Sequence, residues 1–154
     1  MDRDKSLPFI NTFRSIRLTN NKGLVYNLTS MVAELSIFED IFSNTLSGEL
    51  VIADGNGASD IMNVTGNDKL TVELFNGENI ELHEFFVYAT TNRIRNNNTS
   101  EVYKLQFCSF ESILNENTRL YSAFTGTNAE SVRLIFRNYI GSSKTLGVEE
   151  THGQ

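Results

Sequence analysis

The sequence has little or none of several residues on which whole classes of protein depend. It contains one cysteine, one proline, two histidines and no tryptophan. A single cysteine excludes an intramolecular disulfide framework and a cysteine-rich metal site, and Cys108, close to Phe107 and Phe110, is predicted to be a buried strand thiol. Two histidines offer little for a histidine-based metal site or a catalytic triad within one chain. We therefore predict no catalytic residue, no metal and no cofactor, and expect that the protein is not an enzyme.

Basic charge and long apolar runs are also scarce. Thirteen lysines and arginines against 19 acids give a net charge of −6, which argues against a protein that binds the phosphates of nucleic acids. No apolar run approaches the roughly 18 residues of a membrane span. The first residues, MDRDKSLPFI, lack an apolar stretch, so we expect no signal peptide. The composition is that of a soluble globular chain.

Alternating apolar and polar residues predict strands over most of the first 110 residues. The expected strands are residues 12–19, 31–39, 48–55, 69–75, 84–94 and 101–109, the last two forming a hairpin around a polar loop at 96–100. In the second of these strands the alternation places Met31, Ala33, Leu35 and Ile37 on one face and Val32, Glu34, Ser36 and Phe38 on the other. A helix is the competing interpretation there, because alanine and glutamate are depleted in strands.

The pattern changes to helical after Phe110. A short helix is expected over 111–115, and a clearer one follows Thr127, which stands in capping-box relation to Glu130. An apolar stripe follows at helical spacing, formed by Val132, Ile135, Phe136 and Tyr139. Gly141 is placed to end this helix. The stripe must pack on another element.

These elements predict a mainly β fold with one or two helices (α+β), a small antiparallel β-barrel or sandwich flanked by the amphipathic helix. The expected division is an N-terminal arm over 1–11, one domain over 12–141 and a flexible tail or linker over 142–154. The predicted core residues are Leu35, Ile37, Leu50, Ile52, Leu70, Val72, Leu74, Tyr103, Leu105, Phe107, Val132, Ile135 and Phe136.

Three polar clusters are candidate chemical sites. Residues 54–60 contain the acids and asparagine of a calcium loop, but not the distal glutamate or the sixth-position glycine, so we interpret them as a turn. The acids between Glu34 and Glu49 are interpreted as a solvated face rather than a glycosidase pair. Arg93, Arg95 and Lys104 could form a small basic patch, which solvated strands explain equally well.

Polar residues on one face of several strands are the more informative feature. They suit a sheet whose outer surface meets water or a hydrated channel, and sheets closed between subunits form rings with point-group symmetry. The candidate lumen-facing residues, selected on alternation alone, are Glu34, Ser36, Glu73, Lys104 and Gln106.

Four segments in succession carry a resemblance to a known family. They are VAELSIFEDIFSNTLSGELVIADG (32–55), GNDKLTVELF (66–75), the hairpin FFVYATTNRI…VYKLQFCSFESILN and the capped helix TNAESVRLIFRNYIG. In this order they resemble the first tube-fold domain of baseplate central hub proteins from T4-like contractile-tailed phages. The resemblance covers about residues 12 to 141.

The resemblance implies a fold, partners and a location. The fold is a phage tail-tube β-barrel with a helix on its flank, and the subunits form a ring, a trimer with pseudo-sixfold character in a hub. This ring connects the tail tube above it to the central spike below it and surrounds the channel for DNA. An acidic, polar lining lets a polyanion pass without sequence-specific binding. The implied location is the virion's tail baseplate, after assembly in the host cytoplasm and without direct membrane binding.

The chain departs from this family in length, because hub proteins continue well beyond one tube domain. It is therefore either a fragment of a longer hub or a single-domain ring protein, such as a hexameric tail tube protein or a secretion-system tube. A monomeric ligand-binding β-barrel is the alternative from a different class, and the eleven phenylalanines permit an aromatic-lined cavity. An enzyme is the weakest alternative, because no nucleophile–base pair is visible.

Overall fold

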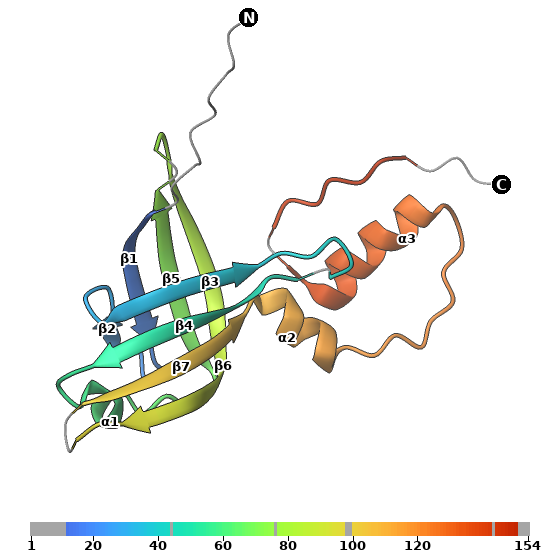
Figure 1. Cartoon of the computed structure of the whole chain (residues 1–154). Coiled ribbons are helices and arrows are strands. Elements are labelled where there is room, and N and C mark those ends of the chain that lie inside the picture. The colour runs from blue at the N-terminus through green and yellow to red at the C-terminus, as the bar shows by residue number, and fades with distance from the viewer. Residues whose placement is uncertain (1–11, 44, 76, 98–99, 143, 151–154) are drawn as a thin grey trace, which may run out of the picture. The chain divides into compact units, whose positions relative to one another are not determined.

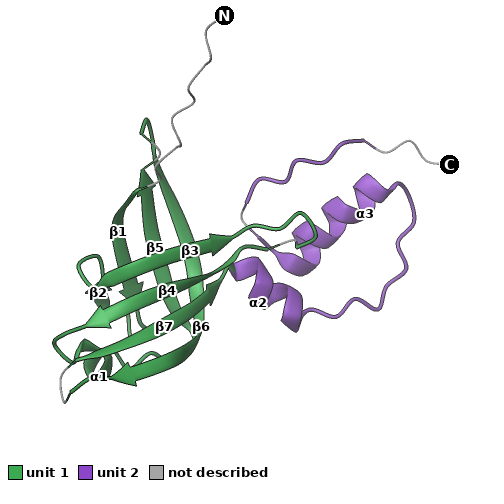
Figure 2. Ribbon diagram, viewed as in Figure 1, with its two compact units in different colours: residues 1–109 green, residues 110–154 purple. Residues whose placement is uncertain are grey.

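The computed structural model describes residues 12–43, 45–75, 77–97, 100–142 and 144–150, and it divides into two compact units (Figures 1 and 2). The boundary falls between Ser109 and Phe110, inside the 12–141 span that the sequence suggested as one domain. All strands of the described residues belong to the first unit. The arm expected over 1–11 lies outside the described residues.

The first unit is a seven-stranded sheet in which all neighbouring strands pair antiparallel. The strands are β1 (Thr12–Thr19), β2 (Val25–Asn27), β3 (Val32–Phe38), β4 (Ser47–Asp54), β5 (Asp68–Phe75), β6 (Ile80–Arg95) and β7 (Glu101–Cys108). Their order is β2-β1-β5-β6-β7-β4-β3, so β2 and β3 are the end strands.

The long strand β6 makes the sheet curl. Its first half pairs with β5 and its second half with β7, and its register against β7 shifts twice. Bulges of this kind bend a strand and increase its twist. In Figure 1 the strands β3, β4 and β7 accordingly cross in front of β1 and β5. The predicted mainly β, antiparallel fold with a few helices is confirmed, with the sheet curled into a half-barrel.

The inner face of the curled sheet carries the core. The fully buried apolar residues are Ile16, Leu18, Leu28, Leu50, Ile52, Met62, Leu70, Val72, Phe85, Val87, Tyr103, Leu105 and Phe107. Seven of them were predicted, and the predicted Leu35, Ile37 and Leu74 pack against them while partly buried. Leu28 and Met62 were missed because they lie outside the strands, where no alternation marks them. Cys108 is buried, as predicted.

The predicted faces of β3 are wrong at its first residues. Its register against β4 shifts between Val32 and Glu34. Val32 therefore packs against the core, while Ala33 is exposed. Beyond the shift Leu35 and Ile37 point inward, as predicted. A bulge adds one residue to one strand, and alternation alone cannot locate it.

The second unit consists of α2 (Phe110–Asn117), α3 (Asn128–Ile135) and a π-helical continuation of α3, η1 (Phe136–Ile140). The predicted capping box is confirmed: the Thr127 hydroxyl accepts from the Glu130 N–H at 3.2 Å, and the Thr127 N–H donates to Glu130 Oε2 at 2.8 Å. Gly141 ends the helical segment with φ 64°, in the left-handed region that favours glycine. None of the helices among the described residues is long and apolar enough to cross a membrane.

The predicted core stripe of this unit is wrong in its depth of burial. Val132 is 45% exposed, and Ile135 and Phe136 are only half-buried. Ala129 is the one buried apolar residue among those described in the unit. A few short helices have too little shared surface to enclose a core of their own.

The segment after the helices forms side-chain contacts with them. Glu111 of α2 accepts hydrogen bonds from the Ser142 hydroxyl and from Lys144 Nζ, both at 2.8 Å. Arg133 of α3 pairs with Glu150 at 2.5 Å. The segment was predicted to be a tail or linker without regular structure, and its described residues form no helix or strand.

Candidate functional site

The candidate lumen-facing residues lie on the outer face of the sheet, opposite the core. Across β3, β4 and β7 the register aligns Ser36 with Glu49 and Glu49 with Gln106. The next outward-facing residue of β4 is Val51. It is paired with Glu34 on β3 and with Lys104 on β7. Because Leu35, Leu50 and Leu105 form the parallel inward row, alternation directs these polar side chains outward.

Glu49 lies at the centre of this polar row. Lys104 Nζ donates to its Oε2 at 2.7 Å, and Gln106 Nε2 donates to its Oε1 at 3.4 Å. The hydrogen bond from Lys104 is the main cause that lowers the pKa of Glu49, and the same bond raises the pKa of Lys104. Ser36 donates to Glu34 at 3.1 Å. We call Glu34, Ser36, Glu49, Lys104 and Gln106 the outer row.

The place of Glu49 in the outer row was not predicted. In the sequence Glu49 stands close to the other acids between Glu34 and Glu49, and proximity along the chain gives no information on its partners. Its partners Lys104 and Gln106 come instead from β7, 55 and 57 residues further along. Alternation within β4 was the available signal, since it places Glu49 on the face opposite Leu50.

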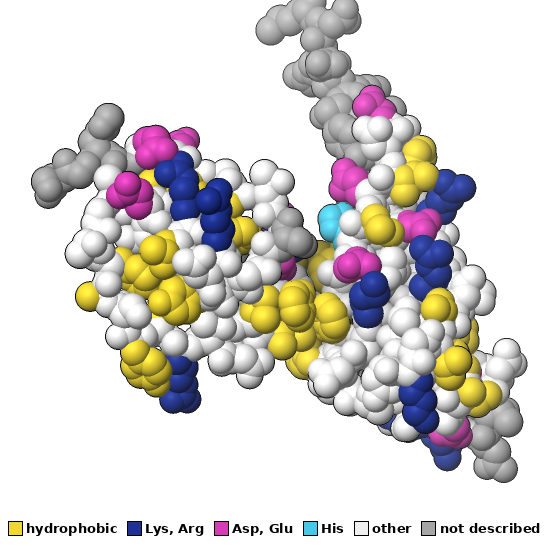
Figure 3. Space-filling model, turned by 180° about the vertical axis from the view of Figure 1, so that it is seen from behind, with side chains coloured by type: hydrophobic (Ala, Val, Ile, Leu, Met, Phe, Trp, Pro, Cys, Tyr) yellow, Lys and Arg dark blue, Asp and Glu magenta, His cyan; other side chains and the backbone are white. Residues whose placement is uncertain are grey.

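Glu73 belongs to a different part of the outer face. It accepts a hydrogen bond from Arg17 Nη2 at 2.6 Å across β1 and β5. Strand β6 separates β5 from β7, and so separates this pair from the outer row. Lys69 and Glu84 form another cross-strand pair at 2.8 Å. On the face of this unit that Figure 3 displays, acidic and basic side chains are interspersed, so the charges there are largely compensated locally.

The three bases of the candidate basic patch lie in two places and are paired with acids. Lys104 lies in the outer row, whereas Arg93 binds the carboxylate of Glu101 through Nε at 2.7 Å and Nη2 at 2.8 Å. Arg95 lies 3.6 Å from the same carboxylate. Glu101 is only 4% exposed, and it also accepts from the Ser59 hydroxyl. The bonds from Arg93 and then Ser59 lower the pKa of Glu101.

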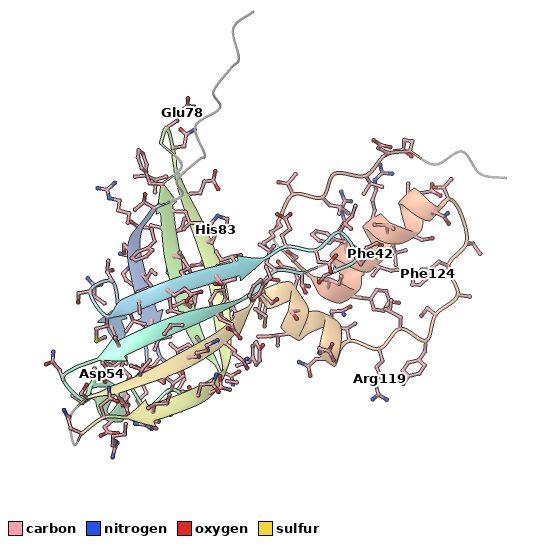
Figure 4. The ribbon with its side chains drawn as sticks, viewed as in Figure 1. Phe42, Asp54, Glu78, His83, Arg119 and Phe124 are labelled. Carbon is pink, nitrogen blue, oxygen red and sulfur yellow. The ribbon has the colours of Figure 1, made fainter. Side chains whose placement is uncertain are left out.

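The loop after β4 turns at residues 55–57, as predicted, but residues 58–60, interpreted as part of the same turn, begin a short helix that was not predicted. Asp54 Oδ1 accepts from the N–H of Asn56 at 2.9 Å and its Oδ2 from the N–H of Ser59 at 2.8 Å, which fixes the entry to α1 (Ala58–Met62; Figure 4). Burial raises the pKa of Asp54, but these backbone hydrogen bonds outweigh it and the pKa is lowered. Among the described residues no group of three histidine, cysteine, aspartate or glutamate side chains could hold a metal ion.

Two hollows open at the end of the sheet where β1 begins. The larger, of about 610 Å³, has an apolar floor that includes Phe13, Leu35 and Leu74, and three carboxylates with His83 line it as well (Figure 4). Those carboxylates belong to Glu34, Glu39 and Glu81, so Glu34, on the end strand β3, borders this hollow as well as the outer row. The smaller hollow, of about 350 Å³, is lined by Thr12, Phe13, Arg14, Phe75 and Ile80. We call the first the acidic groove and the second the end groove.

Comparisons with known proteins identify no family for this chain. Neither a scan against protein-family models nor a search of curated proteins finds a match.

Proposed function

We propose that the chain is a structural ring subunit of a phage contractile tail, the tube domain of a baseplate hub. In this role it connects the tail tube to the central spike and surrounds the DNA channel. The observation that carries the proposal is the outer row together with an open, curled sheet whose end strands are β2 and β3. An open sheet edge is a template for pairing with another chain. The resemblance of the four sequence segments supports the same assignment.

The outer row has the chemistry that a DNA channel needs. Its lysine is already paired with Glu49, and the whole chain carries a net charge of −6, so no concentrated positive charge would hold phosphates. Non-specific DNA binding depends on unpaired lysines and arginines that release counterions. A surface of compensated charges and hydroxyl or amide groups lets the polyanion pass. No catalytic step is part of this function.

The number of copies distinguishes the members of this class. A hub closes its ring with three subunits that each carry two tube domains, whereas a tail tube or secretion-system tube needs six copies of one domain. Light scattering on the purified chain, followed by negative-stain imaging, measures this number. We expect rings of three or six copies with a central hole.

The assignment of the channel face is tested by reversing charge there. Replacing Glu34, Glu49 and Glu73 by lysine should leave the copy number unchanged and make the rings retain duplex DNA at low salt. The matched control replaces three exposed acids elsewhere, Glu78, Glu116 and Glu149, and has the same net charge. Equal DNA retention by both triple variants would contradict the assignment of the outer face to the channel. Thermal unfolding of each variant checks that the fold is intact.

A monomeric ligand-binding barrel is the second candidate, favoured by the acidic groove. Its apolar floor and volume of about 610 Å³ fall in the range of small-molecule sites. The carboxylates that line it would select a cationic, partly apolar ligand. This candidate requires a chain that stays monomeric at every concentration and gains thermal stability when such a ligand is added.

A further inference from the structure

The connection between β3 and β4 presents two apolar side chains to solvent. Ile41 is 92% exposed and Phe42 is 94% exposed, and Figure 4 shows Phe42 in the loop beyond the strand ends. The loop is held in a defined turn: Asp40 Oδ1 accepts from the Phe42 N–H at 2.9 Å, and the Asp40 carbonyl accepts from the Ser43 N–H at 3.0 Å. An adjacent isoleucine and phenylalanine held out in water indicate a contact with another surface. We call residues 39–42 the hairpin tip.

The end groove is an apolar surface of matching size on the same unit. Thr12, Phe75 and Ile80 are aligned across β1, β5 and β6, and Phe75 and Ile80 remain 41% and 50% exposed. The hollow of about 350 Å³ has room for the side chains of one isoleucine and one phenylalanine. Arg14 lines the groove, is exposed, and has no ion-pair partner among the described residues.

The charges of the hairpin tip match the end groove and not the acidic groove. The tip carries Glu39 and Asp40 directly before its two apolar residues. The end groove offers Arg14, whereas the acidic groove is lined by Glu34 and Glu81 and by Glu39 of its own copy's tip, and these carboxylates would repel the tip of a second copy. Complementary charge of this kind selects the partner and the register of a contact.

We propose that the hairpin tip of one copy docks into the end groove of the next copy, with Ile41 and Phe42 against Phe75 and Ile80, and with the acids beside Arg14. The inference rests on the proposed function, because it names the contact through which the subunits of the ring meet. The two surfaces differ, so the contact is heterologous and propagates head to tail until a ring closes. Two side chains bury far less than the roughly 1,200 Å² of a stable interface, so the tip fixes the register while sheet edges supply further area.

Cysteine cross-linking tests the contact directly. One population carries Phe42→Cys and a second, of distinguishable mass, carries Ile80→Cys; the native Cys108 is buried. On mild oxidation the mixture should form a disulfide-linked heterodimer in high yield, while each population alone should form little. Equal cross-linking in the mixture and in the separate populations would overturn the proposal.

Charge reversal supplies a second test that does not depend on oxidation. Arg14→Glu should raise the concentration needed for ring formation by about tenfold, and adding Glu39→Arg in the same chain should restore it. Phe42→Ser should weaken assembly at least as much, whereas the matched control Ile94→Ser, at an apolar residue that is 63% exposed on β6, should not. Assembly of Phe42→Ser at the wild-type concentration overturns the proposal.

The outcomes separate this inference from the proposed function. If the wild-type chain assembles and the tip variants assemble equally well, the ring stands and its contact lies elsewhere. If the wild-type chain stays monomeric at every concentration, the proposed function and this contact both fail. If a partner protein rather than a second copy covers the tip, the mixed-population cross-link does not form, and the proposal is overturned in favour of that partner.

Discussion

The two units of the chain bury their apolar side chains to very different extents. In the sheet unit thirteen apolar residues from the strands, a loop and the helix α1 form one buried cluster, most of them with no exposed surface. Among the described residues of the helical unit only Ala129 is buried, and the apolar stripe of α3 stays partly in water. A regular hydrophobic period therefore predicts that a helix or strand forms, but it does not show how deeply that element is buried.

The largest expected effect on stability comes from truncating a buried side chain in the sheet unit, compared with the same kind of truncation in the helical unit. Leu105→Ala removes a fully buried side chain from the interior strand β7 and should lower the free energy of unfolding by about 2–5 kcal/mol. Ile135→Ala removes a half-buried side chain from α3 and should cost about 1 kcal/mol. Urea unfolding followed by circular dichroism measures both. Equal losses would contradict the contrast between the units.

A smaller but more specific effect is expected at Gly48 in the sheet unit. A Cβ added there would overlap the ring of Phe107 and the carbonyl oxygen of Ser36. The backbone carbonyl cannot rotate away as a side chain could, so Gly48→Ala should destabilise the unit by about 1–3 kcal/mol. Gly55→Ala is the matched control, because a Cβ there meets nothing within 4 Å. If the two variants melt alike, the close packing of β3, β4 and β7 at this point is wrong.

The ion pair between the buried Glu101 and the half-exposed Arg93 predicts that the stability of the sheet unit depends on pH. The pKa of Glu101 is held below its ordinary value of 4.5, mainly by Arg93, so the unfolded chain binds a proton more readily than the folded one. The stabilisation is therefore fully present above about pH 4.5 and is lost as the pH falls through the lowered pKa. Asp54, whose pKa is also lowered, adds to the same loss.

Glu101→Gln isolates the contribution of that pair. It should cost about 1–3 kcal/mol at pH 7, nearer the lower figure because Arg93 is 47% exposed and can be solvated. Below pH 4 the gap between this variant and the wild-type chain should narrow. Melting curves recorded from pH 3 to pH 7 give the comparison, and a gap that is constant over this range would argue against the lowered pKa.

The smallest expected effect lies at the start of α3. Thr127→Ala removes the side-chain acceptor of the capping box and should cost about 1 kcal/mol of helix stability. Thr127→Ser keeps a hydroxyl acceptor at the same position, and it should cost only a few tenths of a kcal/mol of helix stability. Amide hydrogen exchange of the first turn of α3 detects the change, because exchange there reports local opening. Faster exchange in both variants alike would contradict the capping role.

Local signals in the sequence predicted much of the fold. Alternation identified β4, β5 and β7 and the inward residues Leu50, Leu70 and Leu105, because each of these strands has one buried face. Thr127 and Glu130 located the start of α3, because both halves of a capping box lie within four residues. The face of Val32 and the length of β6 were not predictable, since bulges depend on the partner strand.

The candidate site was predictable only strand by strand. Alternation placed Glu34, Ser36, Lys104 and Gln106 outward, and the register then brings them together around Glu49. The same reasoning grouped Glu73 with them, although it lies two strands away from β7 beside Arg17. Which strands are neighbours is decided by the long-range packing of the core, which no local period encodes.

The most direct test of the central claim is the solution mass of the chain as a function of concentration. Multi-angle light scattering should give a mass three or six times that of the 17.4 kDa chain, rising to a plateau as concentration increases. The Phe42→Ser variant measured alongside should reach the same plateau only at higher concentration. A constant mass of one chain at every concentration would contradict the account of the protein as a ring subunit.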